Sequence, residues 1–206
     1  MVLAHPRGTP WAYAAWFVMV ACVGLFLPGP ANQVSLTRAY LAPAALSYAL
    51  SPDGLGGLAA VVALAGLTDL LDGTVARRLG GPTKLGGAVD PVVDGIFFGA
   101  VAAGLAIGAA YPAWLAILVI ARYALPAAVG GALLLWGLRP QIKHTFFGQV
   151  CTTLIAVLLG GVALFRGLGL DADAIVRGAA VVLPIATLLT FYDLGRVALR
   201  SRERAA

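Results

Sequence analysis

The chain alternates between long apolar runs and short polar turns, and this alternation limits the folds open to it. Hydrophobic residues make up 61% of the sequence and charged residues 11%, whereas a soluble domain carries about 25% charged residues. Since the first run alone is about one membrane thickness long, we predict an all-α, polytopic membrane bundle. It would have six core transmembrane helices from residue 38 onward and one extra N-terminal anchor helix. The apolar runs occupy residues 11–28, 38–50, 55–71, 88–110, 114–138, 146–165 and 175–194.

The positive charges predict the orientation of this bundle. With the turn at residues 78–84 in the cytoplasm, ten Lys and Arg residues fall inside and three fall outside, as the positive-inside rule requires. The first run lacks a small-x-small cleavage site in the PGPANQ that follows it, so we interpret it as an uncleaved anchor. We expect the net charge of +5 to belong to a rim at the inner membrane, not to a nucleic-acid surface. The inside residues are Arg38, Arg77, Arg78, Lys84, Arg139, Lys143, Arg196, Arg200, Arg202 and Arg204, and the outside residues are Arg7, Arg166 and Arg177.

Four of the nine acidic residues lie in one stretch, DLLDGTVARRLGGPTKLGGAVDPVVD. Asp69 and Asp72 are three apart and Asp90 and Asp94 are four apart, so each pair shares one helix face. Two antiparallel helices would point both pairs into one pocket. Four carboxylates that close need cations between them, and hard divalent ions prefer oxygen ligands. We therefore predict a site for two divalent metal ions, Mg²⁺ or Mn²⁺. A single intramembrane aspartate would instead suggest a proton relay or a partner for a buried arginine.

The spacing of residues around these aspartates forms a longer pattern. It reads D-x-x-D-G-x-x-A-R, then eight residues, then G-x-x-x-D-x-x-x-D. This pattern resembles, with no mismatch, the signature of the CDP-alcohol phosphotransferase family of integral-membrane phospholipid-synthesising enzymes. Together with the hydropathy pattern, the resemblance implies a membrane domain at residues 30–200. We predict the anchor at 1–29 before it and a basic cytoplasmic tail at 201–206 after it.

The resemblance also implies a reaction and a role for each motif residue. A phosphatidyl group would pass from a CDP-linked lipid, usually CDP-diacylglycerol, to a small alcohol, and CMP would leave. The four aspartates would hold the metal ions, and Asp94 would also accept the proton of the attacking hydroxyl. The active site would open to the cytoplasm, in an enzyme that is commonly a homodimer. The residues that would line the CDP site are Gly73, Ala76, Arg77 and Gly86.

A second segment, NQVSLTRAYLAP at residues 32–43, precedes the motif. It is similar to the N-x-L-T-x-x-R…P entry segment of the same family, with Val34 and Ser35 as conservative departures. The resemblance suggests that Asn32 and Ser35 lie near the nucleotide, although a capped helix start explains both residues equally well. We expect this segment to be an interfacial helix or a helix start, with Arg38 at the headgroup level.

The acceptor alcohol is less constrained by the sequence. Arg122 lies in the middle of an apolar run, where a buried arginine needs an anion, so we predict that it binds an acceptor phosphate or pairs with a motif aspartate. Three residues could assist it, although they also fit the positive-inside rule without any such role: Arg139, Lys143 and Arg196. The Asp90-Pro91 pair resembles the branches of the family that use glycerol phosphate or form cardiolipin, but Gly95 stands where those branches often carry lysine.

We favour glycerol 3-phosphate as the acceptor, with inositol phosphate, serine and phosphatidylglycerol as alternatives. A different class of protein, a transporter of cations or protons, would also account for buried aspartates. It gives no reason for Gly73, Ala76 and Arg77 at their offsets, and transport sites tend toward the membrane midplane. An inactive family member with a structural role is a third possibility, against which the complete motif argues.

Overall fold

Each apolar run forms a helix, because a helix satisfies its own backbone polar groups where water is absent. The computed structural model describes the backbone of residues 10–27, 29–79, 86–135 and 146–203, without the side chains of 30–31, 69–79, 86–89, 130–135, 146, 193–194 and 197–203. This part of the chain holds seven α-helices, one short 3₁₀ helix and no strand, which confirms the all-helical prediction. The elements are α1 (Pro10–Leu25), α2 (Pro30–Ala49), η1 (Pro52–Gly54), α3 (Leu55–Leu79), α4 (Gly86–Ile107), α5 (Ala113–Leu135), α6 (Phe146–Gly167) and α7 (Asp173–Glu203).

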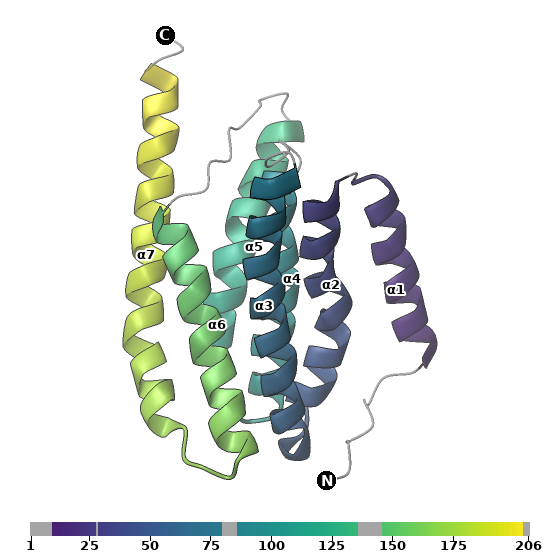
Figure 1. The fold of residues 1–206 in the computed structure, drawn as a ribbon. Coiled ribbons are helices and arrows are strands. Elements are labelled where there is room, and N and C mark those ends of the chain that lie inside the picture. The colour runs from purple at the N-terminus through teal and green to yellow at the C-terminus, as the bar shows by residue number, and fades with distance from the viewer. Residues whose placement is uncertain (1–9, 28, 80–85, 136–145, 204–206) are drawn as a thin grey trace.

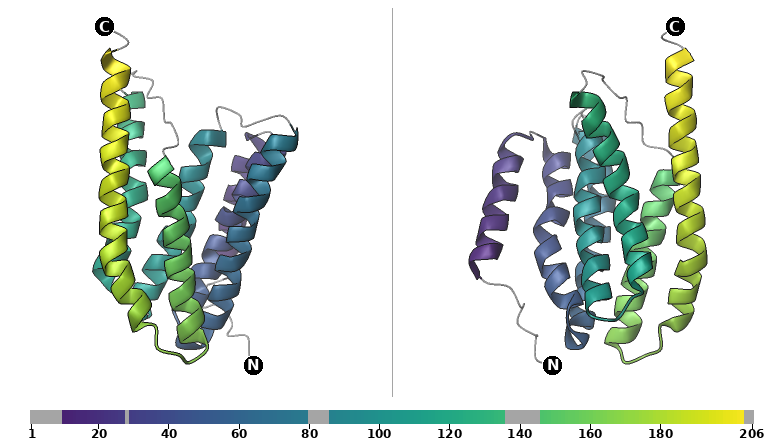
Figure 2. Two further views of the ribbon diagram at one scale, coloured as in Figure 1. Left: turned by 60° about the vertical axis from the view of Figure 1, so that its left-hand side comes forward. Right: turned by 180° about the vertical axis from the view of Figure 1, so that it is seen from behind.

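Six of the helices form a closed ring. Going round it, α2 packs against α4, α4 against α5, α5 against α7, α7 against α6, α6 against α3, and α3 against α2 again. Figure 1 and the two views of Figure 2 show these helices running roughly parallel to one axis, with α1 and α7 at opposite edges. The last helix continues through the basic sequence after residue 194 as far as Glu203. The consecutive helices α3 and α4 run in opposite directions. The C-terminal end of α3 and the N-terminal end of α4, which carry the motif, therefore lie at the same end of the ring (Figure 1).

The distribution of side chains is that of a membrane protein. Large apolar side chains are exposed on the outside of the bundle, for example Leu67 on α3, Ile117 on α5 and Leu188 on α7, whereas a soluble monomer rarely exposes so much apolar surface. By length and composition, three helices of the described residues could cross a membrane, namely Asp90–Ile107, Phe147–Gly167 and Asp173–Tyr192. The apolar parts of α1, α3 and α5 are shorter.

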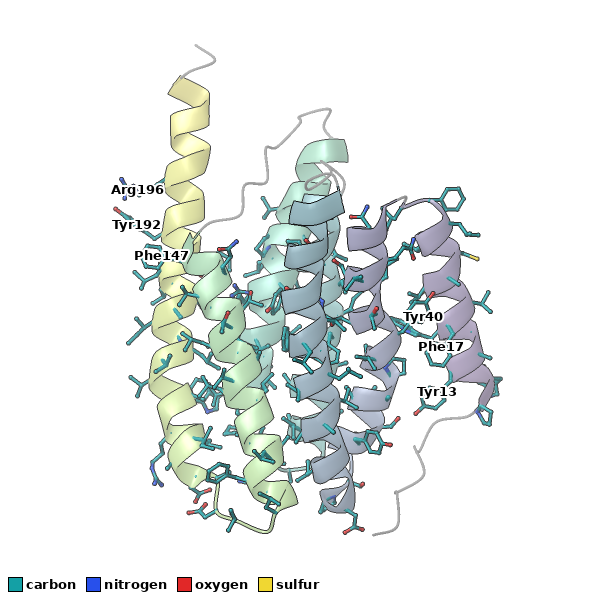
Figure 3. The ribbon with its side chains drawn as sticks, in the orientation of Figure 1. Tyr13, Phe17, Tyr40, Phe147, Tyr192 and Arg196 are labelled. Atoms are coloured by element: carbon teal, nitrogen blue, oxygen red, sulfur yellow. The ribbon has the colours of Figure 1, made fainter. Side chains whose placement is uncertain are left out.

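The N-terminal helix α1 packs on the outside of the ring, against α2. The indole nitrogen of Trp16 donates a hydrogen bond to the carbonyl oxygen of Ala39 at 2.8 Å, and the hydroxyls of Tyr13 and Ser47 are hydrogen-bonded. The rings of Phe17 and Tyr40 stack with their centroids 5.9 Å apart (Figure 3). Polar groups of α1 and α2 therefore satisfy one another, which fixes α1 on the helix that carries the entry segment.

The turn between α4 and α5 holds a buried hydroxyl. Tyr111 is 4% exposed, and its hydroxyl oxygen has no hydrogen-bond partner among the described residues. Burial raises the pKa of Tyr111 to about 12, so the hydroxyl is neutral at physiological pH. A buried polar group without a partner lowers stability, because it has lost its hydrogen bonds to water.

We expect Tyr111→Phe to leave the melting temperature unchanged or to raise it by a few degrees, roughly the effect of removing a desolvation cost of about 1 kcal/mol. Tyr13→Phe is the matched control, because the hydroxyl of Tyr13 is bonded to Ser47 and its loss should lower the melting temperature. Thermal unfolding of both variants in one detergent tests this. A larger loss for Tyr111→Phe than for Tyr13→Phe would contradict the account of Tyr111.

Candidate active site at the α2 and α4 faces

One face of α2 carries three polar residues into the bundle. Asn32, Ser35 and Arg38 are spaced three apart, so they lie along one side of the helix, and they are only 5%, 3% and 2% exposed. The headgroup depth expected for Arg38 stays a prediction, and its side chain is buried inside the bundle. The helix begins at Pro30, so Arg38 falls in its third turn, between α3 and α4, rather than at an interfacial helix start. If the buried Arg38 is left out of the count of Lys and Arg residues, nine still lie on the predicted inner side against three on the outer side.

The carboxylates of α4 face this arginine. A guanidinium nitrogen of Arg38 donates to Oδ1 of Asp94, and its second terminal nitrogen lies 3.9 Å from Oδ1 of Asp90. Both aspartates therefore lie on one face of α4, as their four-residue spacing predicts. The side chain of Asp94 is 12% exposed and that of Asp90 is 37% exposed. The pair thus runs from a buried position at Asp94 toward a more open one at Asp90.

The chemistry of these residues fits a hard divalent ion. Oδ1 of Asp90 is buried and has no hydrogen-bond donor among the described residues, since 3.9 Å to Arg38 is beyond hydrogen-bond distance. An unsatisfied carboxylate oxygen beside a second carboxylate is the kind of ligand that Mg²⁺ and Mn²⁺ prefer. Within the described side chains no group of three His, Cys, Asp or Glu residues gathers at one point, and the other two motif aspartates are not among those side chains.

Several predicted residues have a described backbone but no described side chain. Asp69, Asp72, Gly73, Ala76 and Arg77 all lie in the last three turns of α3. Gly86 is the first residue of α4. The convergence of the α3 pair and the α4 pair on one pocket therefore stays a prediction, with the two helix ends on the same side of the molecule (Figure 1).

Arg122 is buried in α5 and reaches the start of α6. It is 6% exposed, and one terminal nitrogen donates to the carbonyl oxygen of Gly148 at 2.7 Å and to Oγ1 of Thr152 at 3.2 Å. Its guanidinium carbon lies 4.6 Å from the ring centroid of Tyr123. Nε of Arg122 is buried and has no hydrogen-bond partner in the described part of the chain. Arg122 thus forms no ion pair with Asp90 or Asp94, whose arginine partner among the described side chains is Arg38.

Gly95, the residue after Asp94, marks a close approach of α4 to α5. A Cβ atom at Gly95 would lie 2.8 Å from Cβ of Tyr123, which is too close for any side chain. The ring of Tyr123 also stacks on Phe98 with centroids 6.3 Å apart. The tyrosine therefore occupies the space beside Gly95, and a lysine at this position would have to displace it.

Of the three remaining basic candidates, the structure describes only Arg196, which lies on the outside of α7. Arg196 is exposed and its guanidinium carbon lies 5.7 Å from the ring centroid of Tyr192. Figure 3 shows both side chains on the side of α7 that faces away from the ring. Arg139 and Lys143 lie outside the described residues. Of the two predicted acceptor residues that the structure describes, Arg122 is buried in the bundle and Arg196 is exposed.

The sequence profile of the CDP-alcohol phosphatidyltransferase family matches residues 30–192. The chain belongs to this family. The match begins at the first residue of α2 and ends within α7, so the CDP-alcohol phosphatidyltransferase region coincides with the ring of six helices and leaves α1 outside. Members of this family generally use divalent metals, which is compatible with the two carboxylates of α4.

Several relatives within the CDP-alcohol phosphatidyltransferase family have assigned names. The chain is 30% identical over 175 residues to a probable phosphatidylglycerophosphate synthase of Mycobacterium tuberculosis, an alignment that covers 82% of this chain and 81% of that protein. It is 32% identical over 123 residues to a putative cardiolipin synthase of the same organism, covering 59% and 57%. It is 33% identical over 101 residues to a CMP-forming cardiolipin synthase of Streptomyces coelicolor, covering 49% and 46%. The chain therefore spans about half the length of these cardiolipin synthases.

The sequence did not predict two contacts at the site, that of Arg38 with the α4 aspartates and that of Tyr123 with Gly95. Arg38 was visible in the three-residue spacing of Asn32, Ser35 and Arg38, which places a charge on the same face as two small polar residues. Tyr123 gave no such signal, because an aromatic residue inside an apolar run is typical of any membrane helix. Its position beside Gly95 depends on how α4 and α5 pack, which spacing along the chain does not specify.

Proposed function

We propose that this chain is a membrane enzyme that transfers a phosphatidyl group from CDP-diacylglycerol to a small alcohol and releases CMP. The observation that carries this proposal is the buried contact of Arg38 with Asp94 and Asp90, which lies inside the region matched by the family. A family match alone would leave open whether the second aspartate pair is in place. Here both carboxylates of that pair face the interior of the ring, beside the polar face of α2.

The residues that would hold the divalent ions are Asp69, Asp72, Asp90 and Asp94. When bound, the ions would neutralise the diphosphate of the donor and stabilise the leaving phosphate. Asn32 and Ser35, buried on the same face as Arg38, would contact the nucleotide together with the small residues Gly73, Ala76 and Gly86. Arg77 would supply a fixed positive charge to a phosphate.

The transfer itself exchanges one phosphorus–oxygen bond for another. The acceptor hydroxyl oxygen forms a bond to the phosphorus of the phosphatidyl group, and the bond from that phosphorus to the oxygen of CMP breaks, with the electron pair leaving on CMP. The hydroxyl proton passes to Asp94, the more buried carboxylate of the pair. Arg38 fixes the orientation of Asp94, as a third group orients a general base in other active sites.

The proposal includes the arrangement in the membrane. The six helices of the ring would span it, α1 would be an additional anchor, and the motif end would face the cytoplasm because nine basic residues then lie inside against three outside. The site would thus meet both the lipid donor and a water-soluble acceptor at the inner face. A homodimer is part of the same expectation.

Glycerol 3-phosphate is the acceptor we favour, because Arg122 supplies a buried guanidinium with an unused Nε–H and the relative aligned over most of its length is named a probable phosphatidylglycerophosphate synthase. Arg139 and Lys143 would assist it from the segment before α6, and Arg196 from the rim. Phosphatidylglycerol is the second candidate, because other relatives are named cardiolipin synthases. Inositol phosphate and serine are further alternatives.

Replacing Arg122 tests its role in acceptor binding. We expect Arg122→Gln to raise the KM for glycerol 3-phosphate about 10- to 100-fold, as the loss of a charge-assisted hydrogen bond would, with little change in the KM for CDP-diacylglycerol. Arg196→Gln is the matched comparison, because that residue is exposed on α7, and its effect should be much smaller. Steady-state kinetics with each substrate varied in turn measures both. Equal effects on the two KM values would contradict the assignment of Arg122.

Product analysis tests the function and names the acceptor. Purified protein in detergent receives CDP-diacylglycerol, Mn²⁺ and one alcohol at a time from glycerol 3-phosphate, phosphatidylglycerol, inositol phosphate and serine, and mass spectrometry identifies the phospholipid formed. We expect phosphatidylglycerophosphate from the first. A cation or proton flux in proteoliposomes, with no phospholipid from any alcohol, would support the transporter alternative and overturn the proposal.

A further inference from the structure

The most buried charged side chain of the described residues is Arg38, and no step above uses it as a reactant. It is 2% exposed, in the helix that packs against both motif helices, α3 and α4. Placing a guanidinium inside a membrane bundle is costly unless anions surround it. Its partners from α4 are Asp94, through a hydrogen bond, and Asp90, at 3.9 Å.

These partners are the same two carboxylates that would bind divalent ions. Four motif aspartates carry four negative charges, which two divalent ions would balance without any help from arginine. In the absence of ions, the positive charge of Arg38 is the counter-charge that the described residues offer to Asp90 and Asp94. A cation that arrives at these oxygens therefore meets a positive charge already in contact with them.

We propose that Arg38 is a positioning residue that acts as a built-in counter-charge for the α4 carboxylates and competes with divalent ions for them. It holds Asp90 and Asp94 on the inner face of α4 when no ion is bound, and it weakens the affinity for ions so that they exchange. The inference rests on the proposed function only in requiring that divalent ions bind at these aspartates. If Arg38 has this role, its contribution to the stability of the protein should be smaller when divalent ions are bound. An arginine with only a structural role would contribute equally with and without ions.

Thermal unfolding and Mn²⁺ titration of purified variants test this. In chelator, Arg38→Gln should lower the melting temperature by about 10 °C, as expected for breaking a buried ion pair, and saturating Mn²⁺ should narrow that gap by about 5 °C, which is what a tenfold tighter dissociation constant corresponds to. The dissociation constant for Mn²⁺, from isothermal calorimetry, should fall about tenfold in Arg38→Gln, because a nearby positive charge has gone. Arg122→Gln is the matched control, since Arg122 is a buried arginine whose described hydrogen-bond partners are neutral. Its melting-temperature gap should be the same with and without Mn²⁺.

Two further variants keep the test decisive if Arg38→Gln folds poorly. Arg38→Lys should show a smaller gap that Mn²⁺ also narrows. The charge-balanced double variant Arg38→Gln with Asp94→Asn should melt above Arg38→Gln in chelator. Failure of the double variant to recover stability, or gaps for Arg38→Gln and Arg38→Lys that Mn²⁺ does not change, would overturn the inference while leaving the proposed function intact. Wild-type protein that binds no Mn²⁺ would overturn the metal site, and the inference with it.

Discussion

Asp94→Asn is expected to lower turnover about 1,000-fold, the order contributed by a positioned general base, while largely preserving the binding of CDP-diacylglycerol. Asp94 is the more buried carboxylate of the α4 pair, and its orientation is fixed by Arg38. An asparagine keeps the shape and one oxygen but does not accept a proton. The rate of CMP release and the affinity for the donor, measured separately, distinguish the two effects.

The comparison variant for this prediction is Asp69→Asn, which removes a proposed metal ligand on α3. We expect Asp69→Asn to weaken donor binding severely, because the diphosphate would lose a bound cation. Asp94→Asn also leaves the charge of Arg38 without one of its partners, so its melting temperature must be measured under the assay conditions. A loss of donor binding in folded Asp94→Asn as severe as that in Asp69→Asn would contradict the role of Asp94 as base.

Gly104→Val is expected to cause a large loss of stability, although Gly104 lies outside the site. A Cβ atom at Gly104 would lie 2.5 Å from Cβ of Ala49 and 3.1 Å from the carbonyl oxygen of Leu46, and one at Gly108 would lie 2.5 Å from the carbonyl oxygen of Ala49. These two glycines, four residues apart, let α4 approach α2 closely, as small residues do in membrane helix pairs. Backbone atoms cannot move aside without separating the two helices.

We expect Gly104→Val to destabilise the protein by about 3 kcal/mol, the upper end for overpacking, which corresponds to a fall of about 10 °C in the melting temperature. Gly66→Val is the matched control, because nothing lies within 4 Å of a Cβ atom at Gly66 in α3. The intrinsic fluorescence of the four tryptophans reports unfolding in detergent. Equal melting temperatures for the two variants would show that α2 and α4 are not so closely packed.

Hydropathy and spacing predicted much of this molecule, because both act locally along the chain. The positions of the helices follow from the apolar runs, and the common face of Asp90 and Asp94 follows from the helical repeat. The family resemblance drawn from the motif is confirmed by the match over residues 30–192. The number of helices that cross the membrane is supported less directly, since only three of those described meet the requirements of length and composition.

Packing between helices was not predictable in the same way. The sequence shows an arginine at position 38, but its burial depends on α2 lying between α3 and α4. Gly95 looked like a departure from the pattern of relatives, and the tyrosine of α5 occupies the adjacent space. The attachment of α1 to α2 depends on single hydrogen bonds, such as that from Trp16 to Ala39. Each of these features joins residues on different helices, and only the packing of the helices brings them into contact.

The release of CMP from CDP-diacylglycerol by the purified protein is the most direct test of the central claim, that the paired aspartates and Arg38 form a site for phosphatidyl transfer. Wild-type protein with Mn²⁺ and an acceptor alcohol should release one CMP for each phosphodiester formed, and chelator should abolish the release. Folded, Mn²⁺-saturated protein that releases no CMP with any acceptor would contradict the account.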